Sequence, residues 1–268
     1  MHICSGIPDY RSPGRPPYKP MQHKDFLANI PNRQRYWSRS LYGYPLLANA
    51  DSNQTHQALA RAEEQQQVKQ IITQNVDGLH QKAGSLDTIN LHGTIHNTIC
   101  LSCGHSESRQ SLQERLFMLN PKLVGTVKPK KIHEKPTASH RPDGDFVSST
   151  DLEASFVIPS CLQCADGILK PDVVFFGGHI ERSVWNHVDK TLEACDALLV
   201  VGSSLTVPSA RRVVRTAMKQ GAELAILNNQ PTPMDDVANL CIKVSISLFM
   251  LYDIYIYQLS FGFVDLCI

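Results

Sequence analysis

Two pairs of cysteines have the spacing of a metal site. The first is Cys100-Leu-Ser-Cys103 and the second is Cys161-Leu-Gln-Cys164, with a long insertion between them. Zinc binds four thiolates in a tetrahedron, and the Cys-x-x-Cys spacing turns two sulfur atoms toward one point. The alternatives are a chance pattern or two redox pairs, although a redox pair belongs at a helix start after a strand. Because four protein ligands leave no open position, we expect a structural zinc ion rather than a catalytic one.

Polar residues follow three expected strands at the point where each strand ends. They are Gln74, Asn75, Val76 and Asp77 after the first strand, Gly202, Ser203 and Ser204 after the second, and Asn228 and Asn229 after the third. Ligands of open parallel sheets bind beyond the carboxyl ends of the strands, and such side chains can bond ribose and phosphate groups. Each group alone is as well explained by a helix cap. The three together predict a nucleotide site, although the Gly-x-Gly-x-x-Gly fingerprint is absent.

A histidine and an N-terminal turn are two further candidates. His92 precedes a glycine that would let a ligand approach closely, but a lone histidine is more often packed or solvated than catalytic. Near the chain start, Gly6, Pro8 and Asp9 have turn chemistry, and Arg11 offers donors for a carboxylate or phosphate.

These residues must be positioned by alternating strands and helices. We predict strands within 68–73, 170–178, 197–205 and 223–229, and helices around 25–28, 33–40, 111–120, 181–194 and 208–220. Ser111 and Glu114 have the spacing of a capping box for the third helix. Continuous apolar strands separated by helices are typical of a parallel sheet covered on both faces. The sequence therefore predicts an α/β fold, a Rossmann-like parallel sheet with a smaller zinc-binding module inserted.

We expect two structural units from this order. The Rossmann-like domain comprises residues 1–97 and 166–268, and the zinc module with its long insertion comprises residues 98–165. Composition is that of an ordinary soluble protein, with 42% hydrophobic residues and a net charge of +1, so neither nucleic acid nor an anionic membrane surface is an expected partner. Neither a secretory signal nor a transit peptide is visible before the first motif.

The C-terminal tail has a different composition. Residues 244–264 contain Asp253 as their only charged residue, which approaches the length of a membrane span. Apolar and polar residues alternate at 244–248 and 254–257, a strand pattern rather than a helical one. We expect a buried or poorly fitting strand and no membrane span.

Taken together, the motifs resemble the sirtuin family. The resemblance covers roughly residues 5–245, and its motifs occur in the family's order: GIPDYRS (6–12), QNVDGLH (74–80), LHG (91–93), the two cysteine pairs, KPDVVFFGG (170–178) and GSSL (202–205). RQRYWSR (33–39), PDGD (142–145) and the insertion are most similar to the mitochondrial class II branch around sirtuin four. The resemblance implies an NAD-dependent protein-lysine deacylase that yields nicotinamide and O-acyl-ADP-ribose. ADP-ribosyl transfer and lipoamidase activity are further possibilities for this branch.

The resemblance also implies roles for residues at the matching motifs. His92 would be the general base, and acylated-lysine proteins would be the substrates. The acyl-lysine peptide would pair as an added strand with Val173, Val174, Phe175, Phe176 and Gly177. NAD would contact Gly6, Ile7, Pro8, Asp9, Tyr10, Arg11, Gln74, Asn75, Val76, Asp77, Gly202, Ser203, Ser204, Asn228, Asn229 and Gln230. Zinc would be structural, and the location would be the mitochondrial matrix.

The N-terminus departs from the family pattern. The family's first strand and its Gly-Ala-Gly-Ile-Ser phosphate loop should precede Ser5, where only Met-His-Ile-Cys stands. Loss of a central strand would expose apolar neighbours, and loss of the loop would remove N–H donors for the pyrophosphate. We therefore expect weak NAD binding and poor stability. The alternative to an active deacylase is a truncated, catalytically silent chain that keeps zinc and protein binding.

Overall fold

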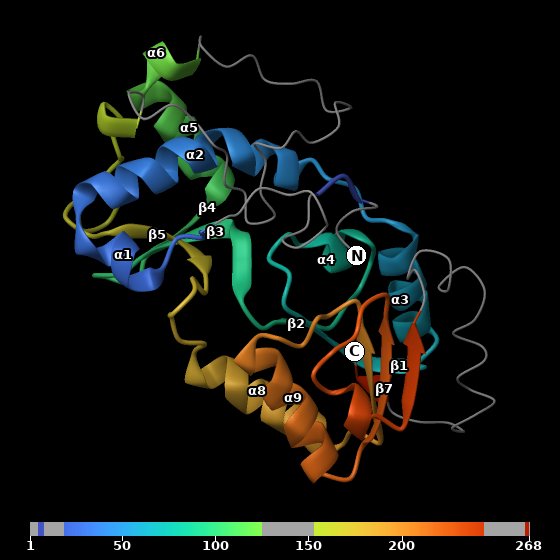
Figure 1. The fold of residues 1–268 in the computed structure, drawn as a ribbon. Coiled ribbons are helices and arrows are strands. Elements are labelled where there is room, and N and C mark those ends of the chain that lie inside the picture. The colour runs from blue at the N-terminus through green and yellow to red at the C-terminus, as the bar shows by residue number, and fades with distance from the viewer. Residues whose placement is uncertain (1–4, 8–18, 125–152, 244–265, 268) are drawn as a thin grey trace.

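Two sheets organise the chain (Figure 1). The computed structural model describes residues 5–7, 19–124, 153–243 and 266–267. In this part of the chain the larger sheet has six strands in the order β2-β1-β9-β6-β7-β8, with parallel neighbours throughout. Its strands are β1 (Val68–Thr73), β2 (Thr88–Asn90), β6 (Ala197–Val201), β7 (Glu223–Asn228), β8 (Leu240–Lys243) and β9 (Leu266–Cys267).

Helices cover both faces of this sheet. The helices α8 (Arg182–Glu193) and α9 (Pro208–Lys219) pack on one face, and α3 (Gln54–Glu64) packs on the other. Along β6, Leu198 and Val200 belong to the α8–α9 core, whereas Leu199 and Val201 belong to the α3 core. Successive side chains of a strand point to opposite faces, so a strand covered on both faces must be apolar at every position.

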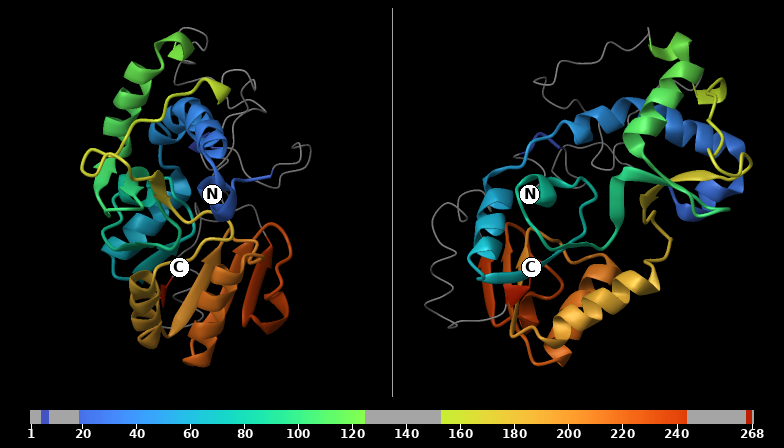
Figure 2. Two further views of the ribbon diagram at one scale, coloured as in Figure 1. Left: turned by 90° about the vertical axis from the view of Figure 1, so that its left-hand side faces the viewer. Right: turned by 180° about the vertical axis from the view of Figure 1, so that it is seen from behind.

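The smaller sheet is antiparallel and has the order β4-β3-β5. Its strands are β3 (Gly93–Cys100), β4 (Ser106–Ser108) and β5 (Leu169–Val173). It shares a core with α1 (His23–Ala28), α2 (Ile30–Ala48) and α5 (Arg109–Leu119), which Figure 2 shows on the opposite side of the molecule from α8 and α9. Short elements complete the described chain: α4 (Leu79–Lys82), α6 (Pro121–Val124) and the 3₁₀ helix η2 (Asp235–Val237).

Glycine is required at the start of β3. Gly93 has φ +79°, and a Cβ there would lie 2.1 Å from the carbonyl oxygen of Asp172 on β5. No side chain fits this gap, so the residue after His92 must be glycine for β3 and β5 to pair. This close approach fixes the backbone beside His92.

The predicted α/β fold is confirmed, with helices on both faces of a parallel sheet and a cysteine cluster in a separate antiparallel part. β1 has the predicted bounds, β6 and β7 lie within their predicted stretches, and α8 and α9 end within one residue of the prediction. The helix predicted at 33–40 is longer, Ile30–Ala48, and α3 was not predicted. The division into two domains stays a prediction.

The strand predicted within 170–178 is present as β5, which ends at Val173; beyond it the Gly178 N–H donates to the Phe175 carbonyl and the His23 N–H donates to the Phe176 carbonyl. One local prediction is wrong, the helix cap. Ser108, not Ser111, caps α5, and its hydroxyl accepts from the Ser111 N–H at 3.1 Å. Ser108 lies three residues before Ser111, so its hydroxyl provides the capping acceptor about one helical turn before the predicted cap.

The tail contributes a strand at an unexpected place. β9 pairs with β1 through Val68↔Leu266 and with β6 through Ala197↔Leu266, so it lies between them inside the sheet. The predicted strand at 244–264 lies outside the described residues. Among the described residues no helix is long and apolar enough to cross a bilayer.

Candidate functional site

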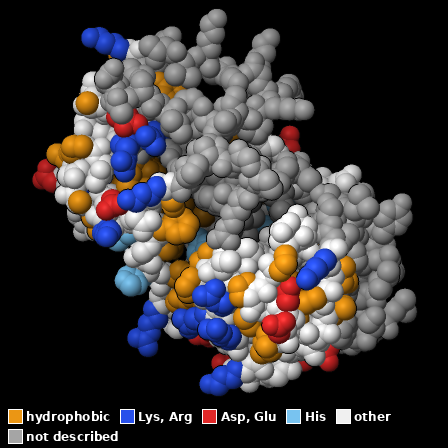
Figure 3. Space-filling view, in the orientation of Figure 1, with side chains coloured by type: hydrophobic (Ala, Val, Ile, Leu, Met, Phe, Trp, Pro, Cys, Tyr) orange, Lys and Arg blue, Asp and Glu red, His pale blue; other side chains and the backbone are white. Residues whose placement is uncertain are grey.

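A large cavity lies at the carboxyl ends of β1, β6 and β7, between the two sheets. The described residues around it line a cleft of about 1970 Å³. On the face shown in Figure 3, hydrophobic and histidine side chains are exposed between the part that contains α1 and the part that contains α8. The predicted site residues that line the cavity are Gln74, Asn75, Val76, His92, Val173, Val174, Phe175, Phe176, Gly177, Gly202, Ser203, Ser204, Asn228, Asn229 and Gln230. The fold thus brings together segments that are far apart in the sequence.

His92 is held by a hydrogen bond at each ring nitrogen. Its Nδ1 lies 3.1 Å from the carbonyl oxygen of Gln74, and its Nε2 lies 3.0 Å from Oγ of Ser209. A carbonyl oxygen can only accept, so Nδ1 carries the proton and Nε2 of the neutral ring is the basic atom. Burial lowers the pKa of His92, and the Gln74 carbonyl opposes this effect in part. The residue is therefore an oriented, neutral base at neutral pH.

The segment after β1 is fixed by its own polar contacts. Gln74 Nε2 donates to Oγ of Ser203 at 2.9 Å, which links the ends of β1 and β6. Asp77 is buried, does not line the cavity, and accepts from the Leu79 N–H at 3.0 Å through Oδ1. Its carbonyl oxygen lies 2.8 Å from Nε2 of His96. In this conformation the Asp77 carboxylate caps α4, whereas Gln74 and Asn75 line the cavity.

The loops after β6 and β7 lie side by side at the same edge. The Gly202 N–H donates to the Leu227 carbonyl at 2.9 Å, and Asn228 Nδ2 donates to the Gln230 carbonyl at 2.9 Å. Gly202 has φ +64°, the left-handed region that glycine adopts without strain. Amide and hydroxyl groups from both loops thus line one wall of the cavity.

The predicted N-terminal turn is described only in part. Gly6 has φ +75°, and Ile7 is 1% exposed and packs with Tyr44, Leu79 and Ile95. Pro8, Asp9, Tyr10 and Arg11 lie outside the described residues. Ile7 therefore anchors this turn in the core, although neither it nor Gly6 lines the cavity.

The predicted peptide segment runs along the cavity from β5 toward α8. The Val174 N–H donates to the His92 carbonyl at 2.9 Å, which places the segment directly beside the base. Phe176 is 47% exposed and forms a parallel bridge with Gln22. An exposed aromatic side chain on the segment next to a half-buried base is suited to contact an extended ligand.

Sequence reasoning missed several cavity residues. Arg35 and Arg39 lie one turn apart on α2 and both line the cavity, where Arg39 Nε pairs with Glu153 at 2.7 Å. Their i, i+4 spacing in RQRYWSR was the available signal. Ser209 was also missed, because nothing local marks a serine near a helix start as the partner of a distant histidine.

The four predicted zinc ligands converge. Their Sγ atoms all lie within 4.8 Å of one another, with 3.6 Å between Cys100 and Cys164 and 3.7 Å between Cys103 and Cys161. A tetrahedron with Zn–S bonds of about 2.3 Å has edges near ~3.8 Å, so the cluster fits zinc. Gly167 makes room for it, because a Cβ there would lie 2.1 Å from Sγ of Cys100. The cysteines would hold the metal with no open position.

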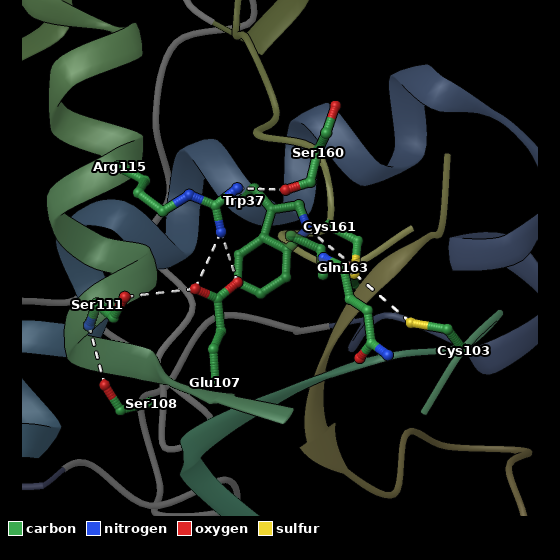
Figure 4. A network of polar contacts seen from close by, with 10 residues as sticks. Trp37, Cys103, Glu107, Ser108, Ser111, Arg115, Ser160, Cys161 and Gln163 are labelled. Atoms are coloured by element: carbon green, nitrogen blue, oxygen red, sulfur yellow. Dashed lines mark hydrogen bonds and ion pairs between the residues drawn. The ribbon is translucent and has the colours of Figure 1, made fainter. Parts of the chain in front are cut away.

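A polar network supports this cluster (Figure 4). Arg115 of α5 pairs with Glu107 of β4 at 2.7 Å, and its second terminal nitrogen donates to the Ser160 carbonyl beside Cys161. The Glu107 side chain is 4% exposed. The network therefore ties α5, β4 and the second cysteine pair into one unit.

Comparisons with known proteins agree with this geometry. The model of the Sir2 family matches residues 1–209. The chain is 42% identical over 246 residues to the human NAD-dependent protein lipoamidase sirtuin-4, mitochondrial, covering 90% of this chain and 74% of that protein. It is 44% identical over 233 residues to the NAD-dependent protein deacylase SIR4 of Monosiga brevicollis, covering 87% and 74%. Among solved structures, the complex titled Sir2-p53 peptide-NAD+ is 25% identical with a TM-score of 0.71, covering 97% of this chain and 90% of that one.

Proposed function

The chain belongs to the Sir2 family, and on this basis we propose that it is an NAD-dependent protein-lysine deacylase. The observation that carries the proposal is His92, a base with a fixed tautomer in a cavity lined by polar groups from three strand ends. The products would be deacylated lysine, nicotinamide and O-acyl-ADP-ribose.

The cavity residues would orient the reactants. The acyl-amide oxygen is a weak nucleophile, so it can trap C1′ of the ribose as nicotinamide departs only when both are pre-oriented and water is excluded. The cavity edge of β5 and the Val174–Gly177 segment would hold the acyl-lysine peptide as an added strand next to His92. Apolar side chains such as Phe175 would exclude water from the acyl group.

His92 would then move one proton. Its Nε2 would accept the proton of a ribose hydroxyl, whose oxygen attacks the imidate carbon. The Gln74 carbonyl supports this role, because it accepts from Nδ1–H in both the neutral and the protonated ring. Ser209 would give up its place at Nε2 to the ribose hydroxyl.

The strand-end residues would bind NAD. Gln74, Asn75 and Val76 would contact the nicotinamide end, the segment Gly202–Ser204 the phosphate and ribose region, and Asn228 to Gln230 the adenosine. We retain Asp77 at the nicotinamide end, although its carboxylate would first have to leave the Leu79 N–H to reach the cavity. We retain Gly6 to Arg11 in the proposed NAD site, next to the core position that Ile7 occupies.

The finer assignment follows the sirtuin-four relatives. We propose acylated proteins of the mitochondrial matrix as substrates, because the human and bovine sirtuin-4 relatives are described as mitochondrial. Lipoyl-lysine is the first acyl group to test, since those relatives are named lipoamidases. ADP-ribosyl transfer is a second activity to test.

The test is NAD-dependent release of nicotinamide in the presence of acylated peptide. We expect release with lipoyl- or acetyl-lysine peptide that falls by about 10²-fold or more in His92→Ala, the usual contribution of a general base. His187→Ala is the matched control, because His187 is exposed on α8 and does not line the cavity. Release at the same background rate by wild type and His92→Ala would contradict the deacylase proposal and favour the alternative of a truncated, catalytically silent chain.

A further inference from the structure

Ser209, His92 and the Gln74 carbonyl form a line of three hydrogen-bonded groups. The distances are 3.0 Å from Ser209 Oγ to Nε2 and 3.1 Å from Nδ1 to the Gln74 oxygen. Because Nδ1 must carry the proton, Nε2 accepts from the serine hydroxyl. A hydroxyl that donates to an imidazole, which in turn donates to a fixed acceptor, is the arrangement of an activated nucleophile. Here a backbone carbonyl takes the position that an acidic side chain occupies in a Ser-His-Asp triad.

Ser209 also lies in the first turn of a helix, where backbone N–H groups favour nearby negative charge. It is the second residue of α9, after Pro208, and both line the cavity together with Ala210. The first N–H groups of a helix have no partner within the helix, and Val207 provides no side-chain cap. The N–H groups of Ser209 and Ala210 can therefore face negative charge that develops next to the serine, in a helix of 12 residues.

The base is available and the serine is accessible. Burial keeps the pKa of His92 below its ordinary value, so the ring is neutral and Nε2 can take a proton at pH 7. Ser209 is half-buried on the cavity wall, and Val174 and Leu205 contribute apolar surface to the same cavity. A short acyl group can reach the hydroxyl through the space that the described residues leave open.

We propose that this chain has a second activity that needs no NAD: hydrolysis of activated esters of short carboxylic acids through an acyl-Ser209 intermediate. Ser209 Oγ would attack the ester carbonyl carbon while its proton passes to His92 Nε2. The C–O bond to the alcohol would then break, and the proton would leave with the alcohol. A water molecule, deprotonated by His92, would hydrolyse the acyl-serine to the acid and return the serine hydroxyl. The sum is ester plus water to acid plus alcohol, without an oxidant or a reductant.

This activity does not rest on the proposed deacylation, because it uses neither NAD nor an acyl-lysine peptide. The probe is p-nitrophenyl acetate with the full chain freed of nucleotide, and the readout is p-nitrophenolate. We expect a burst of about one equivalent per chain followed by slower turnover. The steady rate should fall by about 10²-fold in both Ser209→Ala and His92→Ala. Ser183→Ala, an exposed serine on α8, is the matched control and should hydrolyse the ester at the wild-type rate.

Peptide mapping after a quenched burst tests the same idea without a variant. The acetyl group should lie on Ser209, and Ser209→Cys should restore a burst because a thiol is also a nucleophile. A burst of the same size in Ser209→Ala, or acetyl groups found only on lysines, would overturn the proposal. Nicotinamide release, measured separately on the same preparations, shows whether the proposed deacylase function fails on its own.

Discussion

Single residues decide the chemistry of this cavity. His92 was predictable as a base only through the motif Leu-His-Gly, because a lone histidine has many uses. The two hydrogen-bond partners of His92 could not be predicted. Gln74 contributes a backbone atom, and Ser209 belongs to a helix that begins 116 residues after His92 in the chain. Gly93 was the clearer signal. It has room for no side chain, so the geometry beside His92 depends on it.

The first prediction concerns the pH dependence of nicotinamide release. Activity needs neutral His92, and burial lowers the pKa of this residue below its ordinary value of about 6.5. The acid limb of kcat/KM should therefore lie below pH ~6.5, with activity retained from there to neutral pH. The measurement is kcat/KM from about pH 5 to 8 at fixed ionic strength. An acid limb clearly above pH ~6.5 would mean that His92 is more solvated or faces a negative charge in the working enzyme.

Elements with strong periodicity were predicted well, and those set by distant contacts were not. β1 has the predicted bounds, because its apolar residues and flanking polar residues are a local signal. β5 is shorter than its apolar run, and past it the Phe176 carbonyl accepts from the His23 N–H of another segment. α3 has only a weak sequence signal although Asn53 and His56 form a capping box, since its apolar face consists mostly of alanine. The cavity lies where strand ends were expected to meet.

At the same scale, the zinc cluster should stabilise the smaller sheet. Cys100 ends β3, and the second pair leads into β5, so the metal would join two neighbouring strands. Cys103→Ser should reduce bound zinc from about one ion per chain to nearly none and lower the melting temperature, because structural zinc contributes directly to folding. Elemental analysis and circular dichroism measure the two effects.

Cys241→Ser is the matched control for this variant. Cys241 is also an exposed free cysteine, but it lies on β8 and outside the cluster. It should keep its zinc and its melting temperature. Full zinc content in Cys103→Ser would contradict a site with four cysteine ligands.

On the scale of the whole molecule, the large sheet is joined through its smallest strand. β9 has two residues, and it alone connects β2-β1 with β6-β7-β8 in the described sheet. A strand this short has no sequence signal, so its pairing could not be predicted. We expected the loss of the family's first strand to leave the neighbouring strands unpaired. β9 instead covers part of the edges of β1 and β6. Only the first residues of β1 and β6 are paired with it. Weak NAD binding and low stability stay predictions.

The contribution of β9 can be measured with a backbone substitution. Cys267 lies between β1 and β6, so its backbone N–H faces one of these two strands. Proline has no backbone N–H and would remove this donor. We expect Cys267→Pro to lower the free energy of unfolding by about 1–3 kcal/mol, the range for a buried polar group left unsatisfied. Cys267→Val keeps the N–H and should remain close to wild type. Urea denaturation of both variants gives the comparison, and equal midpoints would show that β9 does not hold the sheet together.

The position of β9 has a consequence for biosynthesis. A ribosome makes β1 early and β6 much later, but the strand that joins them is made after both, and after β8, which ends at Lys243. The edges of β1 and β6 that β9 covers therefore stay open until residues 266–267 have been translated and have left the ribosome. An open apolar edge attracts other chains. We expect the nascent protein to depend on chaperones that cover these edges until β9 pairs with both strands.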